Sequence, residues 1–513
     1  MLAWTSVAMA ALLIRLFVLP VWPIPQPRIH DEFSYLLSAD TFSSGRVTNP
    51  SHPLWHFFET FHVLSVPTYA SKYPPAQGLV LAFGQIVFRH PWFGVWLSAG
   101  AMAGALCWML QGWLPSGWAL LAGSIAMLRL AALGDWTNSY WGGAVAATGG
   151  ALVLGAYPRI VFRSRMYYSW AFWFGAVILV NSRPFEGMLL ILPCSVALLG
   201  WAFRGNAFAC RNRAFHLLGS GVILICAAGI AMGYQNWRVT GSPLRLPYLE
   251  YERQYSASPL LMFESERPSP VYRNEQMRRY YEEISGDFSF GRSLEGSMKK
   301  LADFGRTLRF FFGPLLILFV FVIKAFSRRR LRLVLICLIL GAAGLAVEPW
   351  HRPEHAAPFV GALFLVWAQC ARQLRLWSWR GRDVGRGLVA STVALSLVLL
   401  VILRANHWKS PGERVLHPLD RRAAIEAELL HTGESHLIFV RYAPMHSVHE
   451  EWVYNRARID EAQIVWARDL GALENRKLIS YFSRRVAWIL EPDVKPVRLR
   501  PYVAPVAGAS PIR

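Results

Sequence analysis

The chain has 513 residues, of which 54% are hydrophobic and 22 are tryptophans, and its mean hydropathy is positive. The apolar residues fall in long blocks separated by short basic clusters, which excludes an ordinary soluble protein and indicates a polytopic membrane protein. The formal net charge of +21 does not indicate nucleic-acid binding, because the basic residues gather in loops between the apolar blocks. We therefore expect a lipid bilayer as a partner, and no nucleic acid.

The first apolar block, residues 3–22, is predicted to be a retained membrane span. It lacks the basic n-region of a signal peptide, and the "VWPIPQPRIH" that follows is a poor cleavage site. The further spans that hydropathy predicts are residues 167–181, 187–203, 215–234, 307–323, 333–347, 356–371 and 387–404.

Charge in the loops predicts which way these spans run. Four loops, at 159–165, 204–213, 324–332 and 372–386, hold sixteen basic residues and one acid. An excess of Lys and Arg marks the cytoplasmic side, so we place these loops in the cytoplasm and the other connections outside.

The region from 76 to 158 contains four apolar pieces, and the charges require an odd number of crossings there. The pieces lie near 76–89, 91–111, 117–133 and 142–157. We expect one of them, of which the first is the shortest, to be re-entrant or too short to span. The predicted fold is an α-helical polytopic membrane protein with about eleven spans.

Two outer segments and a tail complete the predicted organisation. A transmembrane domain, residues 1–404, includes the outer loops 23–75 and 236–305, and the second loop is long enough to be a folded cap or lid. The tail, 405–513, contains the helix pattern "RRAAIEAELL" and the strand patterns "HLIFVRY", "AQIVWA" and "RVAWIL". It is predicted to be a small extracytoplasmic α/β domain.

Two adjacent carboxylates, Asp31 and Glu32, follow the first span at the edge of the membrane. A charged carboxylate there is costly unless it has a partner or a purpose, and one purpose is to remove a proton from an attacking hydroxyl or amine. If this segment is a helix, the two side chains point about 100° apart, so only one can aim directly at a substrate. An ordinary helix-capping acid remains the alternative.

Other outer motifs supply groups that suit a phosphate or a sugar. "SKYPPAQG" places Lys72 before a rigid turn, and "NSRPFEG" sets Arg183 and Glu186 three residues apart, either as a phosphate site or as an ion pair between helices. "EPWHRPEHAAP" contains His351 and His355, whose spacing would suit zinc if a proline did not break the helix, so a cationic pocket fits better. "DWTNSYWGG" has the aromatic and small polar residues of a sugar-stacking loop or of an aromatic belt.

Four of these motifs, "HDEFSYLLSADTF", "SKYPPAQG", "RPFEG" and "HAAP", resemble the C-type membrane glycosyltransferase superfamily. The resemblance covers residues 1–404 and is nearest to the bacterial protein mannosyltransferase and aminoarabinose transferase group. It implies a multi-pass enzyme of the cell inner membrane that transfers a sugar from a polyprenyl-phosphate donor to a protein, glycolipid or cell-envelope glycan outside the cytoplasm.

The resemblance also implies roles for individual residues. Asp31 would be the catalytic base, with Glu32 holding the acceptor or the base. The candidates for binding the donor phosphate are Lys72, Tyr73, Arg183 and Arg352. The candidates for binding the rest of the substrates are His30, Asp135, Asn138, Tyr140, Glu186, His351 and His355. We expect no metal ligands and no obligatory cofactor, although a divalent metal is left open. Ala356, which stands where the family usually has an aromatic residue, departs from the pattern, and the tail matches no function.

Three other functions remain open at this stage. A transporter or flippase would need ionisable groups inside the spans, for which Arg15 and Arg129 are the candidates. A lipid-linked saccharide ligase or polymerase would depend on Arg and His in the large outer loop, and a non-catalytic assembly protein would need neither.

Overall fold

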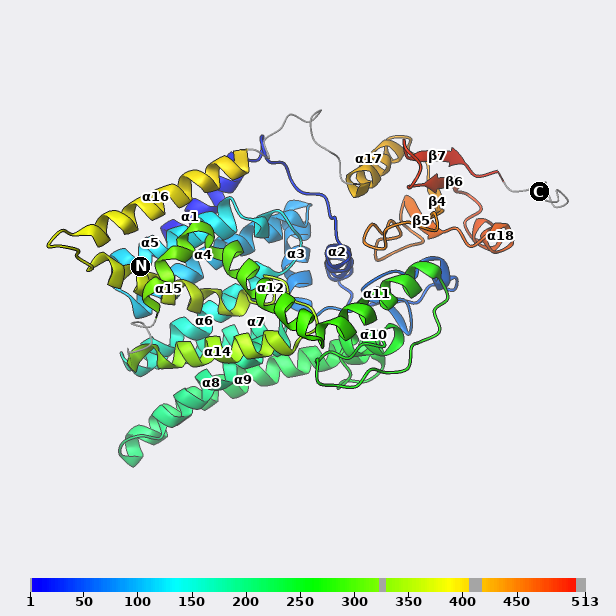
Figure 1. Cartoon of the computed structure of the whole chain (residues 1–513). Coiled ribbons are helices and arrows are strands. Elements are labelled where there is room, and N and C mark those ends of the chain that lie inside the picture. The colour runs from blue at the N-terminus through cyan, green and yellow to red at the C-terminus, as the bar shows by residue number, and fades with distance from the viewer. Residues whose placement is uncertain (1, 323–328, 406–417, 504–513) are drawn as a thin grey trace.

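Apolar helices form the body of the molecule in the computed structural model, which describes residues 2–322, 329–405 and 418–503 (Figure 1). The helices long enough to cross a membrane are α4 (Trp92–Trp113), α6 (Gly143–Val161), α8 (Pro184–Ala202), α9 (Ala207–Thr240), α14 (Arg332–Val347) with the turn before it, and α16 (Val384–Ala405). Shorter apolar helices are α1 (Leu2–Phe17), α3 (Pro75–Phe88), α5 (Ser116–Ala126), which continues into a π-helical stretch to Ala132, and α7 (Tyr168–Val180). The 3-10 segment η4 (Gly313–Phe321) and α15 (Val360–Arg375) pack among them. The predicted polytopic helical fold is confirmed.

Helix α3 corresponds to the first of the four apolar pieces. Its 14 residues give about 21 Å, less than the roughly 30 Å of a bilayer core. Gly94, near the start of α4, lies against both the Val80 carbonyl and Gly84, so α4 begins beside the middle of α3. This geometry agrees with the expectation that this piece does not span the membrane on its own.

The first outer loop, 23–75, is more ordered than the sequence suggested. It contains α2 (His30–Ser43), the one-turn helix η1 (Trp55–Phe57) and three short antiparallel strands, β1 (Asn49–Pro50), β2 (Val63–Leu64) and β3 (Thr68–Ser71), in the order β1-β3-β2. The second loop contains α10 (Pro247–Tyr255), α11 (Glu275–Gly291) and α12 (Leu294–Phe312). It is therefore folded, as predicted, although α9 extends further along the chain, to Thr240, than the expected span.

The C-terminal region folds as a small α/β sheet. Its elements are α17 (Pro418–Leu430), β4 (His436–Val440), β5 (Ile464–Arg468), α18 (Ala472–Tyr481), β6 (Val486–Glu491) and β7 (Arg498–Pro501). The strand order is β5-β4-β6-β7, with β4 parallel to β5 and β6, and β7 antiparallel at the edge. Every residue of β4 and β5 is buried, as expected of parallel strands covered on both faces. The predicted helix and three strands are all present.

The sheet shares its hydrophobic core with the first outer loop. Phe57 and Phe58 lie in one cluster with Leu437 and Phe439 of β4. Phe33 of α2 stacks on Tyr454 with ring centroids 4.2 Å apart. In Figure 1 the sheet accordingly lies beside α2, α10 and α11. The C-terminal region is thus packed directly over the segment that carries Asp31.

Small residues let the late "HAAP" motif approach the helical body closely. A Cβ atom on Gly150 of α6 would lie 2.0 Å from the Pro358 carbonyl oxygen, which is a clash with backbone. Ala356 and Ala357 are buried in the same core. Close backbone packing of this kind gives Ala356 a structural reason to be small.

The ion pair that joins Glu451 to Arg468 is expected to contribute strongly to stability. The pair is 2.6 Å long and its side chains are at most 4% exposed, so Glu451→Ala would leave a buried charge without its partner and lower the unfolding free energy by roughly 3–5 kcal/mol. The matched control is Glu461→Ala, in the exposed Arg458–Glu461 pair, with an expected loss below about 1 kcal/mol. Thermal unfolding of the purified protein, followed by tryptophan fluorescence, measures both. Equal shifts of Tm would contradict the prediction.

Candidate active site

Glu32 fixes the start of α2 through three backbone amides. Its Oε2 accepts hydrogen bonds from the amides of Arg28 (2.7 Å) and Ile29 (3.2 Å), and its Oε1 accepts one from the amide of Tyr140 (2.9 Å). The first two bonds resemble a capping box, in which a residue of the first turn reaches back to the helix start. Burial raises the pKa of Glu32, and these amides offset part of that rise. The Glu32 carboxylate thus links the start of α2 to the loop that contains Tyr140.

Asp31, one residue earlier, faces a different direction. Its Oδ1 accepts a hydrogen bond from the Tyr73 hydroxyl. Burial, followed by the charge of Asp31, raises the pKa of Tyr73 well above its ordinary value, so this hydroxyl stays protonated and donates. The two adjacent carboxylates therefore have different surroundings, as the 100° offset in a helix predicts.

Lys72 is enclosed rather than free. Its Nζ lies 2.8 Å from Glu252 Oε1 of α10 in a pair that is almost fully buried, and 4.7 Å from the ring centres of both Tyr248 and Tyr251. An ammonium between aromatic faces and a carboxylate is well stabilised. Its charge is thus already balanced by Glu252, a residue that none of the sequence motifs singled out.

A cavity of about 580 Å³ opens beside these residues. Most of its lining is apolar. It comes from the end of α7, the start of α8, the last turns of α9, from α10 with its flanking residues and the loop after it, and from the loop after α14, including Val180, Phe185, Leu246, Leu249, Leu261 and Trp350. The polar groups on its wall include Lys72, Tyr73, Arg183, Glu186, Glu348 and His355. Three of the predicted site motifs supply these polar groups, so the fold brings together segments from residue 72 to residue 355.

Arg183 holds a prominent place on this wall. Its Nη1 lies 3.8 Å from Glu186 Oε1, which is an ion pair without a hydrogen bond. Its Nη2 is buried and has no hydrogen-bond partner among the described residues. A buried guanidinium donor that is not satisfied by the protein suits an anionic ligand oxygen.

Glu348 and His355 lie across the same wall. His355 Nδ1 is 3.0 Å from Glu348 Oε2. Burial raises the pKa of Glu348 to about 7, and burial together with the charge of Arg183 lowers the pKa of His355 to about 4. The imidazole is therefore neutral at pH 7.

Three predicted substrate residues of the 135–143 loop have structural contacts. Asp135 pairs with Arg404 at 2.8 Å, and Asn138 Oδ1 accepts a hydrogen bond from Arg15 at 2.9 Å. The Tyr140 hydroxyl donates to the Pro25 carbonyl at 3.1 Å, in addition to the bond between its amide and Glu32. None of the three is among the residues that line the cavity. These contacts tie the 135–143 loop to α16, to α1 and to the connection before α2.

The remaining predicted residues also lie off the cavity wall. His351 Nε2 contacts the Thr307 hydroxyl at 2.8 Å, and Arg352 is exposed. His30 is buried and does not line the cavity, and its Nδ1 contacts the Tyr454 hydroxyl at 2.8 Å. Burial lowers the pKa of His30 to about 3, so its ring is neutral.

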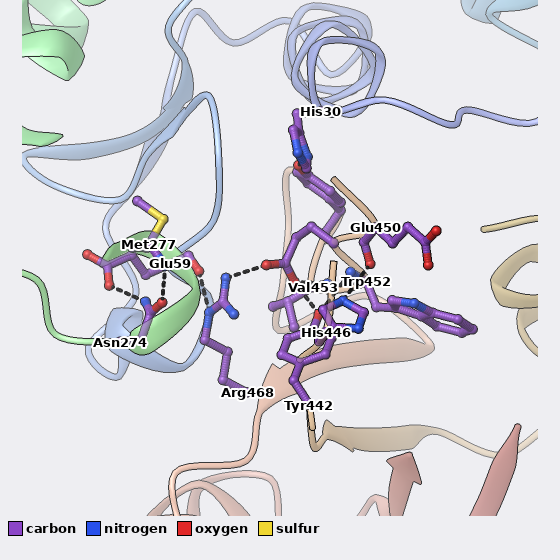
Figure 2. A network of polar contacts seen from close by, with 12 residues as sticks. His30, Glu59, Asn274, Met277, Tyr442, His446, Glu450, Trp452, Val453 and Arg468 are labelled. Carbon is purple, nitrogen blue, oxygen red and sulfur yellow. Dashed lines mark hydrogen bonds and ion pairs between the residues drawn. The ribbon is translucent and has the colours of Figure 1, made fainter. Parts of the chain in front are cut away.

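A polar network roofs the site and includes residues of the C-terminal region (Figure 2). Arg468 donates from Nε to the Glu59 carbonyl at 2.7 Å and forms the buried pair with Glu451. Glu59 also accepts a hydrogen bond from Asn274 of the second outer loop at 2.8 Å. Three segments far apart in the sequence are thereby joined. The sequence offered no signal for the contacts among Arg468, Glu451, Glu59 and Asn274, because none of these four residues belongs to one of the predicted site motifs.

Comparison with known proteins extends these findings. No protein-family model and no curated protein sequence matches the chain. Among solved structures, the chain is similar to ArnT of Cupriavidus metallidurans in the apo state and bound to undecaprenyl phosphate. Both matches have 13% identity and cover 95% of this chain and 93% of the other, with TM-scores of 0.52 and 0.53. The apo oligosaccharyltransferase of Archaeoglobus fulgidus matches with 10% identity over 95% of this chain and 69% of the other, at a TM-score of 0.46. The similarity to ArnT, an aminoarabinose transferase, shows that the chain has the fold of a C-type membrane glycosyltransferase.

Proposed function

We propose that the chain transfers a sugar from a polyprenyl-phosphate donor to an acceptor on the outer face of the bacterial inner membrane. The observation that carries this proposal is the position of Tyr73, which lines an apolar cavity and hydrogen-bonds Asp31. A carboxylate that is one hydrogen bond away from the wall of an apolar cavity suits a reaction on a lipid-borne sugar. The ArnT structure with undecaprenyl phosphate supports this choice of donor, because the two chains share a fold.

In the proposed reaction the acceptor's hydroxyl or amine attacks the anomeric carbon while Asp31 takes its proton. The carbon–oxygen bond to the carrier phosphate breaks, and the phosphate leaves with the electron pair, with inversion at the anomeric carbon. Arg183 would stabilise the charge that develops on the leaving oxygen. Lys72 is less suited to this role, because Glu252 already neutralises it.

The contacts of Arg15 and Arg129 argue against a transporter. Arg15 donates to the Trp22 carbonyl at 2.9 Å and to Asn138, and Arg129 donates to the carbonyls of Phe311 and Phe310 at 2.6 and 3.0 Å. Each arginine satisfies backbone groups where a helix or its connection ends. Neither therefore provides the ionisable path that the transporter hypothesis required.

Asp31→Asn is expected to reduce transfer at least about 100-fold without loss of folding, because the amide cannot accept the proton. Labelled polyprenyl-phosphate sugars and total envelope acceptors, supplied to membranes with matched amounts of protein, measure the rate and identify the productive sugar. Wild-type activity in Asp31→Asn would refute the role of base.

Glu32→Gln is the companion variant, with a different expected outcome. It replaces an acceptor of three amides by a side chain with one acceptor oxygen, so both the Tm and the activity should fall. A large loss of activity with an unchanged Tm would instead point to direct participation of Glu32 in the reaction.

Arg183→Gln is expected to raise the donor KM and lower kcat, because the phosphate loses a buried donor that the protein does not otherwise use. Arg352→Gln is the matched control, since this arginine is exposed and does not line the cavity. Steady-state kinetics with a fixed acceptor distinguish the two. Equal effects of both substitutions would remove Arg183 from the donor site.

A further inference from the structure

Three potential metal ligands converge on the cavity wall. One carboxylate oxygen each of Glu186 and Glu348 and one ring nitrogen of His355 all lie within 4.8 Å of one another. They come from the first turn of α8, the C-cap of α14 and the loop that precedes η6 (Ala357–Phe359). The sequence had drawn attention to His351 and His355 as a metal pair, but His351 contacts Thr307 instead.

Glu186 is not satisfied by its protein surroundings. The residue is 5% exposed and its side chain accepts no hydrogen bond from any other residue that the structure describes, while Arg183 stays 3.8 Å away. Only its own backbone amide contributes a hydrogen bond. A buried carboxylate of this kind normally has a hydrogen-bonded partner or coordinates a metal. The unpartnered Nη2 of Arg183 beside it indicates that an anion belongs to the same place.

The charges on the wall do not by themselves favour a phosphate. The cavity lining contains three cationic and three acidic side chains, Lys72, Arg183 and Arg267 against Glu186, Glu264 and Glu348. Lys72 is neutralised by Glu252, which stands outside the lining. With Lys72 set aside, three acidic side chains face two cationic ones where the proposed donor would place its phosphate, and a bound divalent cation would add positive charge there.

We propose that Glu186, Glu348 and His355 bind one divalent cation, which together with Arg183 holds the phosphate of the lipid donor. The part of this inference that concerns phosphate rests on the proposed function, whereas the cation site does not. Two carboxylates with one imidazole suit Mn²⁺ or Zn²⁺ better than Mg²⁺, which prefers oxygen ligands alone. Three protein ligands leave coordination positions that phosphate oxygens can fill.

The first test measures metal binding without any donor. Purified full-length protein in nanodiscs, stripped with EDTA, is titrated with Mn²⁺ while the free-ion EPR signal is followed, and Zn²⁺ competition reports the preferred ion. We expect one site per chain, at least tenfold weaker in Glu348→Gln and in His355→Ala. Glu264→Gln is the matched control, because it removes a carboxylate from the same cavity but not from the three ligands, and should leave Mn²⁺ affinity unchanged.

The second test asks whether the cation and a phosphate share the site. Farnesyl phosphate, a short polyprenyl phosphate, should tighten Mn²⁺ binding several-fold in the wild type, and by linkage Mn²⁺ should tighten its binding equally. Arg183→Gln should reduce this coupling, and because it removes a positive charge 3.8 Å from Glu186 it should not weaken Mn²⁺ binding itself. Coupling that is unchanged in Arg183→Gln would overturn the shared phosphate site.

The outcomes separate this inference from the proposed function. If no stoichiometric Mn²⁺ or Zn²⁺ binding is found in protein that transfers sugar in an Asp31-dependent manner, the cation site is wrong and the glycosyltransferase proposal stands. If Glu264→Gln weakens binding as much as Glu348→Gln does, the ion responds only to general negative charge and the site is also overturned. Unfolding temperatures of all variants show that losses of binding do not come from misfolding.

Discussion

The arrangement of the site depends on one buried carboxylate, that of Glu32. It is 4% exposed and accepts from three amides, two before α2 and one in the loop that precedes α6. Without these bonds the three amides would lose their partners, and the prolines between α1 and α2 have no amide hydrogen with which to hold the segment in another way. Glu32 therefore holds the irregular connection between α1 and α2 in one conformation, and this fixes the position of the neighbouring Asp31.

The C-terminal region completes this support from the other side. Phe33 stacks on Tyr454, and Arg468 joins the Glu59 carbonyl to Glu451. Burying two opposite charges requires removing both from water, and separating them would leave each charge buried without a partner. The Glu451–Arg468 pair therefore favours one placement of the C-terminal region relative to the first outer loop. Because the same sheet buries Phe57 and Phe58, separation of the C-terminal region would expose apolar surface as well as charge.

Hydropathy and short residue patterns predicted much of the fold. Helices buried in lipid need long apolar segments, and buried strands need short runs of apolar residues, so both can be recognised in the sequence. The helical body, the folded cap and strands β4, β5 and β6 are examples. The roles of single polar residues were harder to predict, because partners come from distant segments: the Glu252 partner of Lys72 is 180 residues away. The same limitation explains why Asp135, Asn138 and Tyr140, chosen for their chemical types, have contacts that hold loops in place.

Three consecutive residues show how the fold uses one helical turn to serve different surroundings. His30 contacts Tyr454 in the roof, Asp31 contacts Tyr73 on the cavity wall, and Glu32 contacts the loop before α6. In the proposed reaction a lipid-borne donor would enter through the apolar cavity, and a polar acceptor would come from the aqueous side. The proposed base would then have to stand between the two. Asp31 contacts the cavity wall through Tyr73, and its two neighbours in sequence hold the turn through contacts with other segments.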